Sequence, residues 1–300
     1  MESHQIVKSR NYDKERRLTH FLYVLPSTLL YTVFTIVPIV SGLYYSFTNW
    51  NGISRVYKYI GVQNYLKIFS DRRFIKAISF NITYAAMLIL CVLILAVILA
   101  LALNANRFHR TFFQMTYFFP ACISMLTIGL VFNYIYFQGV PALGYALNIP
   151  WLQKNILSSK QLAVYGILIA NIWKSVAIPT VLIISALQTI PNEIIESSKI
   201  DGANAFQRFR HIIFRFILPT LSIIFVLLLK EGLMIYDYIV ALTGGGPAGA
   251  TESITMSIYR QGFEDMKFSY AISQAMIVAV IISTVSIFQI KMSSKKKIYD

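Results

Sequence analysis

The sequence predicts an all-α, polytopic membrane protein, and three observations support this fold class. Hydrophobic residues make up 56% of the 300 residues, charged residues only 13%, and the mean hydropathy is +0.60. Apolar stretches long enough to cross a bilayer recur along nearly the whole chain. They are continuous and lack the two-residue alternation of a transmembrane barrel, so each is expected to be a helix.

About six transmembrane helices are expected, because a tilted helix needs about twenty apolar residues to cross the hydrocarbon layer. The expected spans are residues 22–47, 81–103, 112–137, 162–187, 217–241 and 269–290. They form a single six-helix domain over residues 21–292, between a polar tail at 1–20 and a basic tail at 293–300. Several prolines fall in or beside the spans, where ordinary kinks are expected more often than gating hinges.

Lys and Arg residues favour an orientation with both termini in the cytoplasm. Fifteen of the 27 then lie in cytoplasmic segments and ten in external ones, a modest positive-inside bias. The net charge of +14 is divided among short loops on two faces. Membrane lipid therefore explains it better than nucleic acid does.

No catalytic or nucleotide-binding motif stands out in the sequence. The run Gly244-Gly245-Gly246-Pro247 lacks the lysine of a phosphate-binding loop, and the four histidines are far apart. We therefore expect no enzyme activity and no cofactor bound by this chain. If the protein drives active transport, energy enters from a partner or from an ion gradient.

A polar break at residues 191–216 separates the fourth and fifth expected spans. Pro191 and the acidic residues that follow favour a helix start, and the Asp201-Gly202 pair permits a turn into a second helix near Ala203. The segment predicts two short helices at an angle. The residues alone leave open whether it docks on a partner or is an amphipathic connector at the membrane surface.

Residues 196–203, Glu-Ser-Ser-Lys-Ile-Asp-Gly-Ala, resemble the Glu-Ala-Ala-x-x-x-Gly loop of binding-protein-dependent ABC importer permeases, with two serines replacing two alanines. The segment from Tyr236 to Pro247, the Ala-Thr-Glu at 250–252 and the segment from Ile258 to Phe263 resemble the branch that imports sugars, the maltose and glycerol-3-phosphate type. Matches near the amino terminus extend the resemblance over nearly the whole chain.

The resemblance implies a cytoplasmic coupling helix that sits in a cleft of an ATPase subunit. The implied coupling positions are Glu196, Asp201, Gly202, Ala203 and Phe206. It also implies a multi-pass protein of a bacterial-type cytoplasmic membrane. The implied partners are a second homologous permease, two cytoplasmic ATP-binding subunits that hold ATP and Mg, and an extracytoplasmic solute-binding protein.

One feature departs from the family pattern. The proline that ends the loop usually follows the glycine by about thirteen residues, whereas Pro219 lies four residues farther along. Four residues are close to one helical turn, so the second helix is expected to be about 6 Å longer. The expected change is in how deeply the segment docks.

Polar residues inside the expected spans are candidates for a substrate path, because such residues face the interior of a bundle or water. Structural pairing is an equally supported explanation. Lys230 and Asp237 are expected to share one helix face, since they are seven residues apart. The candidate path residues are Asn171, Trp173, Lys174, Lys230, Glu231, Tyr236 and Asp237.

Two other classes of protein are weighed against the ABC permease. An ion-coupled secondary transporter is the alternative, and it would show inverted repeats and broken helices at the midplane. A membrane-embedded enzyme would need a cluster of catalytic side chains. The sequence shows neither an internal repeat nor such a cluster. It does not identify the sugar.

Overall fold

The computed structural model describes residues 19–105, 115–116 and 118–294, and this part of the chain is built from helices. Its strand-like pairing is one isolated bridge between Thr48 and Tyr59. The all-α fold class is therefore confirmed. The expected tail at 293–300 and the start of the span expected at 112–137 lie largely outside the described residues, as does most of the tail at 1–20.

The chain divides into two compact units. Unit 1 comprises Met1–Leu66 and Gln261–Met276, and unit 2 comprises Lys67–Arg260 and Ile277–Asp300. The single domain expected over residues 21–292 stays a prediction.

A buried polar cluster organises unit 1. Its first helix runs over Thr19–Ser46 and includes a π-helical turn, η1 (Thr32–Ile36), followed by α2 (Val37–Ser46). The amide of Asn64 donates hydrogen bonds to the carbonyl oxygens of Ser46 and Thr48, both at 2.8 Å. Ser273 donates to the Ser46 carbonyl at 3.0 Å. These bonds hold the end of α2 against the first turns of α15 (Phe268–Ser294).

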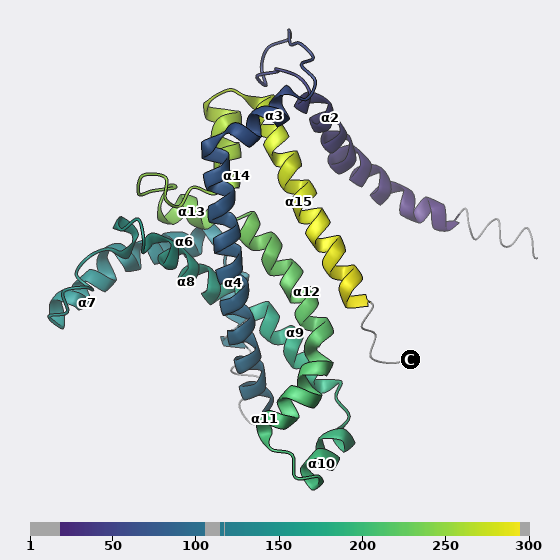
Figure 1. Ribbon diagram of the computed structural model, residues 1–300, viewed down its shortest axis with the longest axis vertical. Coiled ribbons are helices and arrows are strands. Elements are labelled where there is room, and N and C mark those ends of the chain that lie inside the picture. The colour runs from purple at the N-terminus through teal and green to yellow at the C-terminus, as the bar shows by residue number, and fades with distance from the viewer. Residues whose placement is uncertain (1–18, 106–114, 117, 295–300) are drawn as a thin grey trace, which may run out of the picture. The chain divides into compact units, whose positions relative to one another are not determined.

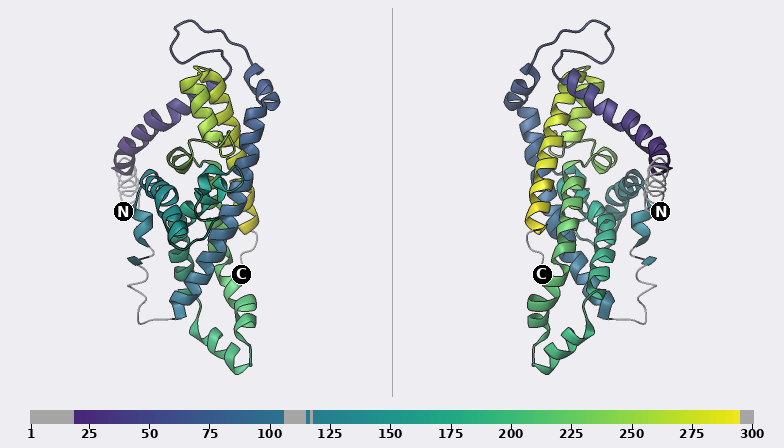
Figure 2. Two further views of the ribbon diagram at one scale, coloured as in Figure 1. Left: turned by 90° about the vertical axis from the view of Figure 1, so that its left-hand side faces the viewer. Right: turned by 90° about the vertical axis from the view of Figure 1, so that its right-hand side faces the viewer.

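Unit 2 contains most of the helices (Figures 1 and 2). A long helix, α4, is packed against α8, α9 and α12, and α13 is packed against α6. Shorter helical segments connect these elements. The elements of unit 2 are α4 (Arg72–Ala105), η2 (Phe119–Cys122), α6 (Met125–Tyr134), η3 (Ile135–Gly139), α7 (Val140–Ala146), η4 (Ile156–Ser158), α8 (Ala163–Ser175), α9 (Ala177–Gln188), α10 (Asn192–Ile200), α11 (Ala205–Arg208), η5 (Phe209–Ile213), α12 (Phe214–Leu233), α13 (Asp237–Leu242) and α14 (Ile254–Tyr259).

Three elements extend beyond one unit: α3 (Gln63–Ser70), η6 (Arg260–Glu264) and α15 (Phe268–Ser294).

Within the described residues, five helices are long and apolar enough to cross a membrane, or six if one bent pair counts as a span. These are Thr19–Ser46, Arg72–Asn104, Met125–Ala146, Ala205–Leu233, Phe268–Gln289 and the pair Ala163–Ser175 with Ala177–Gln188, which is bent by 42°. The prediction of about six spans therefore holds, although the boundaries of three spans were wrong. The second begins at Arg72, nine residues before the expected start at residue 81.

The third span was placed too early. Pro120 lies in the 3-10 turn η2, Ile123 is extended, and Ser124 caps α6 by accepting a hydrogen bond from the backbone N–H of Thr127. A proline interrupts helical hydrogen bonding and a serine cap starts a new helix, so the membrane-length helix begins only at Met125.

The fifth span was placed too late. The helix starts at Ala205 and ends at Leu233, and a separate helix, α13, begins at Asp237. Lys230 and Asp237 therefore lie on different helices, and the prediction that they share one helix face was wrong. Seven-residue spacing predicts a shared face only within an uninterrupted helix.

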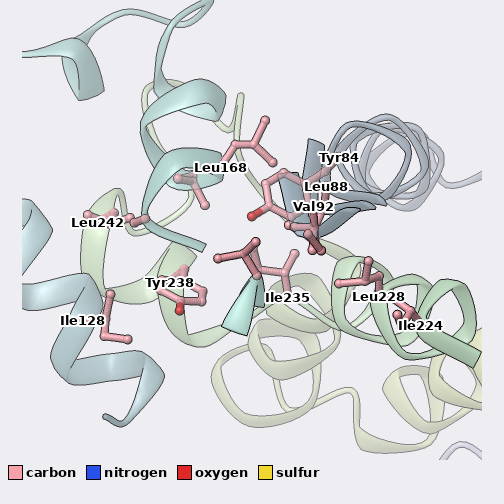
Figure 3. Close-up of a cluster of buried hydrophobic side chains, with 14 of the residues drawn as sticks. Tyr84, Leu88, Val92, Ile128, Leu168, Ile224, Leu228, Ile235, Tyr238 and Leu242 are labelled. Atoms are coloured by element: carbon pink, nitrogen blue, oxygen red, sulfur yellow. The ribbon is translucent and has the colours of Figure 1, made fainter. Parts of the chain in front are cut away.

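The apolar core of unit 2 lies where α4, α8, α12 and α13 meet (Figure 3). Tyr84, Leu88 and Val92 come from α4, and Ile224 and Leu228 come from α12. Close backbone contact tightens this packing, since a Cβ on Gly232 would lie 2.7 Å from Ala85. Small residues at such contacts are typical of helices that associate within a membrane.

Buried side chains satisfy the carbonyl groups that are freed where helices of unit 2 end. Asn81 on α4 donates to the carbonyls of Gly232 and Leu233 at 3.1 and 2.9 Å, and its Oδ1 accepts from the N–H of Ile254 at 2.8 Å. One buried amide thus links α4, the end of α12 and the start of α14. Hydrocarbon offers no water to replace these bonds.

We predict that Asn81→Ala lowers the free energy of unfolding by about 1–3 kcal/mol, because buried carbonyl and N–H groups lose their partners. The measurement is the thermal unfolding midpoint of the purified protein. Asn104→Ala is the matched control, since Asn104 is exposed in the last turns of the same helix. Equal midpoints for the two variants would contradict the role given to Asn81.

Candidate functional site

The segment from Pro191 to Gly202 forms the first half of the tip of unit 2, between α9 and α12 (Figure 1). Pro191 is the N-cap of α10 and Glu193 lies in its first turn, where a negative charge favours the helix dipole. At the other end, Gly202 adopts φ +77°. The N–H of Ala203 bonds to the carbonyl of Ser198 at 3.0 Å and closes the turn. Glycine suits this left-handed conformation because it has no Cβ.

The second helix starts with a capping box. Asn204 Oδ1 accepts from the N–H of Gln207, and Gln207 Oε1 accepts from the N–H of Asn204, both at 2.8 Å. The guanidinium of Arg208 donates to the carbonyl of Ala203, so the turn is also tied to α11. The expected first short helix is present as α10. The prediction of a separate, short second helix was wrong: it begins at Ala205 and continues to Leu233, because nothing between the Asn204 cap and the apolar span interrupts the helix.

The tip presents apolar side chains to its surroundings. Ile200 is 87% exposed and Phe206 is 69% exposed, and Glu196, Asp201 and Gly202 are also exposed. Ala203 is half-buried. Ile200 was absent from the sequence-based candidates, although its place beside the turn was a usable signal. These two apolar side chains are therefore available for contact with a partner or with lipid.

The two serines that replace the family's alanines have different surroundings. Ser197 is exposed, whereas Ser198 is 7% exposed and donates to the carbonyl of Ile195 at 2.7 Å. The buried hydroxyl is thus satisfied within its own helix. Serine can therefore replace alanine here without an unpaired polar group.

The extra residues before Pro219 lie inside one continuous helix. Ala205–Leu233 runs without a break and includes the π-helical turn η5 and, within α12, Pro219. The structure thus shows that the second helix is continuous as far as Pro219 and beyond, and its expected lengthening relative to the family stays a prediction. Its effect on docking depth stays a prediction.

A cavity of about 410 Å³ lies within unit 2 beside the break between α12 and α13. Six of the seven candidate path residues line it, and the exception is Trp173, whose ring contacts Phe132 instead. The structure therefore brings together residues from α8, from the end of α12 and from the break and start of α13 that follow it. The six are Asn171, Lys174, Lys230, Glu231, Tyr236 and Asp237.

A hydrogen-bonded chain crosses one wall of this cavity. Asn171 donates to the hydroxyl of Tyr84 at 3.0 Å, and Ser175 Oγ lies 2.9 Å from Asn171 Oδ1. Ser175 also contacts the carboxylate of Glu231. Three helices, α4, α8 and α12, are thus joined through polar side chains. Sequence reasoning missed Ser175, although its i+4 spacing from Asn171 placed both on one helix face.

The two lysines that line the cavity, Lys174 and Lys230, have different surroundings. Lys174 Nζ donates to the carbonyl of Ile123 at 2.8 Å, at the extended residue between η2 and α6. Lys174 therefore satisfies a backbone group that the helix break leaves free. Lys230 is exposed. The structural explanation thus fits Lys174 better than it fits Lys230.

Tyr238 lines the cavity and is 2% exposed, and its hydroxyl is buried with no hydrogen-bond partner among the described residues. A buried hydroxyl without a partner costs free energy. Such groups are rare in native proteins, and a functional role or a bound water or ion are among their explanations. Sequence reasoning missed Tyr238 as well.

Membrane-length helices with a polar cavity among them indicate a membrane protein with an internal site rather than a simple anchor. Residues 92–297 match the family described as "Binding-protein-dependent transport system inner membrane component". The chain belongs to this family. It is therefore a multi-pass membrane subunit of such a transport system, and an ion-coupled secondary transporter is not favoured.

Curated relatives match almost end to end. The chain is 39% identical over 273 residues to the multiple sugar-binding transport system permease protein MsmF of Streptococcus mutans, covering 91% of this chain and 94% of the relative. It is 29% identical over 279 residues to the probable starch degradation products transport system permease protein AmyD of Thermoanaerobacterium thermosulfurigenes, covering 93% and 95%.

A solved structure has the same fold. It is a bacterial ABC transporter involved in the import of the acidic polysaccharide alginate, matched with a TM-score of 0.81 over 95% of this chain and 98% of that chain. The sequences are 21% identical. This similarity supports the all-α permease fold.

We predict that removing the hydroxyl group has different effects on stability at two buried tyrosines. Tyr84→Phe should lower the free energy of unfolding by about 1–3 kcal/mol, because Asn171 loses its acceptor in a buried site. Tyr238→Phe should leave stability unchanged or raise it, because the lost hydroxyl has no described partner. The two thermal midpoints, measured side by side, test this. A larger loss in Tyr238→Phe would show that the Tyr238 hydroxyl is bonded.

Proposed function

We propose that the chain is the permease subunit of an ATP-driven ABC importer for carbohydrate, with an oligosaccharide as cargo. It forms half of the translocation path and receives energy through residues 196–203. The observation that carries this proposal is the tip formed by α10 and α11, whose backbone is capped from within while Ile200 and Phe206 are exposed.

The tip has the physical properties of a coupling element. Its turn is fixed by Gly202 and by the paired caps of Asn204 and Gln207, and α11 continues without a break into the membrane-length helix that ends at Leu233. A displacement of the tip would therefore reach Glu231, which is on the same helix and lines the cavity.

The proposed assembly contains a second homologous permease, two cytoplasmic ATP-binding subunits and an extracytoplasmic solute-binding protein. Family membership supports this assembly. The modest positive-inside bias supports an orientation with both termini in the cytoplasm. ATP and Mg belong to the partner subunits, and this chain binds no cofactor. Two of its relatives are named for the transport of multiple sugars and of starch degradation products, which supports a carbohydrate cargo.

The cavity beside Glu231 is the proposed part of the path in this subunit. It offers hydrogen-bond donors, hydrogen-bond acceptors and the aromatic rings of Tyr236 and Tyr238. Neutral carbohydrates are bound by a few fixed polar groups together with apolar ring surfaces. The Tyr238 hydroxyl has no described partner and is the candidate hydrogen-bonding group for a sugar hydroxyl.

We predict that Gly202→Pro abolishes ATP-dependent sugar uptake by the reconstituted importer, because proline fixes φ near −65° where the turn needs +77°. It also removes the N–H that bonds to the carbonyl of Lys199 at 3.1 Å. Gly202→Asn is the matched control and should retain uptake. Asparagine tolerates the left-handed conformation, and no atom lies within 4 Å of the added Cβ.

ATP hydrolysis is measured beside uptake in the same preparations. Gly202→Pro should retain the subunits' basal hydrolysis but lose its stimulation by the sugar-loaded binding protein. Wild-type uptake by Gly202→Pro, or uptake by this chain alone without ATP, would contradict the proposed function.

A further inference from the structure

A second cavity in unit 2 lies between the start of α4 and the start of α8, away from the one that contains Glu231. Its volume is about 560 Å³, within the range of small-molecule sites. Its lining includes three cations and none of its described lining residues is acidic. The lining residues are Arg72, Ile75, Lys76, Ser79, Phe80, Thr83, Tyr84, Met87, Lys160, Val164, Tyr165 and Ala250.

The cations that line the cavity come from the starts of two helices. Arg72 and Lys76 lie in the first turns of α4, and Lys160 precedes α8 by three residues. All three are exposed. Glu252, two residues after the lining residue Ala250, accepts from Arg73 at 2.7 Å and from Arg260 at 3.3 Å. That carboxylate is therefore engaged by other arginines.

The N-terminus of α4 does not itself provide the anion site. Asp71 Oδ1 accepts from the backbone N–H of Arg73 at 2.9 Å and so caps the helix. Attraction for an anion at this cavity therefore rests on the side chains of Arg72, Lys76 and Lys160.

Away from the cations, the lining continues along one face of α4. Arg72, Lys76, Thr83 and Met87 follow one another at intervals of four, seven and four residues, about one, two and one helical turns, which places them on one side of the helix. From Arg72 to Met87 the helix rises about 22 Å. One leaflet of a bilayer, including its headgroup layer, is about as thick, since the whole bilayer measures about 40–45 Å.

The far part of the groove is largely apolar. Ile75 is 49% exposed and Tyr165 is 48% exposed, and Phe80 and Met87 form the adjoining wall. A soluble anion needs the cations but has no use for such a wall. An acyl chain attached to an anionic headgroup uses both.

We propose that this groove binds one anionic phospholipid, with its phosphate between Arg72, Lys76 and Lys160 and an acyl chain along α4 as far as Met87. The proposal needs α4 to span the membrane but does not depend on the coupling role of α10. Failure of one proposal therefore leaves the other intact.

The test measures binding of phosphatidylglycerol and phosphatidylcholine by native mass spectrometry, on the protein purified with the subunits that accompany it. The wild type should retain phosphatidylglycerol in preference. The triple variant Arg72→Gln, Lys76→Gln, Lys160→Gln should bind it about a hundredfold more weakly, because each cation near an anionic lipid contributes about a factor of five.

Two matched controls distinguish binding in this groove from general attraction by positive charge and from the effect of adding a bulky side chain elsewhere on the surface. The triple variant Arg55→Gln, Lys58→Gln, Lys154→Gln removes three exposed cations that do not line the groove and should bind normally. Thr83→Trp should fill the groove and weaken binding without changing charge. Ile82→Trp, at an exposed neighbour that does not line the groove, should not weaken it.

Several results would overturn the proposal. Equal retention of the two lipids, or equal losses in both triple variants, would show nonspecific attraction. Displacement of the lipid by free glycerol phosphate, with no effect of Thr83→Trp, would show a site for a soluble anion. Absence of bound lipid in the wild-type complex would show that another subunit or no ligand covers the groove.

Discussion

The structure depends on one constraint: backbone groups inside a hydrocarbon layer need hydrogen-bond partners. In unit 2, side chains supply these hydrogen-bond partners at the positions where helices are interrupted. Asn81 donates hydrogen bonds to the carbonyl oxygens of Gly232 and Leu233 at the end of α12. Asn133 donates to the carbonyl oxygens of Ala241 and Leu242 at the end of α13, and Lys174 donates to the carbonyl oxygen of Ile123. Each side chain comes from a different helix. Hydrogen bonds from neighbouring helices thus stabilise the breaks. The cavity beside Glu231 exists because α12 can end at Leu233.

The membrane class and the approximate spans could be predicted because they depend on length and composition, which are local properties. The breaks could not all be predicted. Pro120 and Ser124 carry recognisable signals, but no proline marks the end of α12, where the deciding partner is Asn81, about 150 residues earlier in the chain. Treating residues 217–241 as one helix therefore placed Lys230 and Asp237 on one face. Periodicity had no means of detecting a helix end stabilised from another helix.

The candidate site likewise has one part that could be predicted from local sequence and one part that could not. The turn at the tip formed by α10 and α11 was predictable because Pro191, Gly202 and the residues between them act on their immediate neighbours. The cavity was predictable only as a set of polar residues. Tyr84 reaches Asn171 across 87 positions of sequence, and nothing local indicates that contact. Ser175 was the exception, since its spacing from Asn171 within α8 already placed them together.

The central claim is that the tip of α10 and α11 contacts a nucleotide-hydrolysing subunit. A single cysteine at Ile200, with Cys91 and Cys122 replaced by alanine, allows a short cross-linker to capture whatever lies against this exposed residue in native membranes. Mass spectrometry of the product should identify a partner with a phosphate-binding loop, and the yield should change when ATP is added. Cross-linking to lipid alone, or to no protein while the importer remains active, would contradict the account.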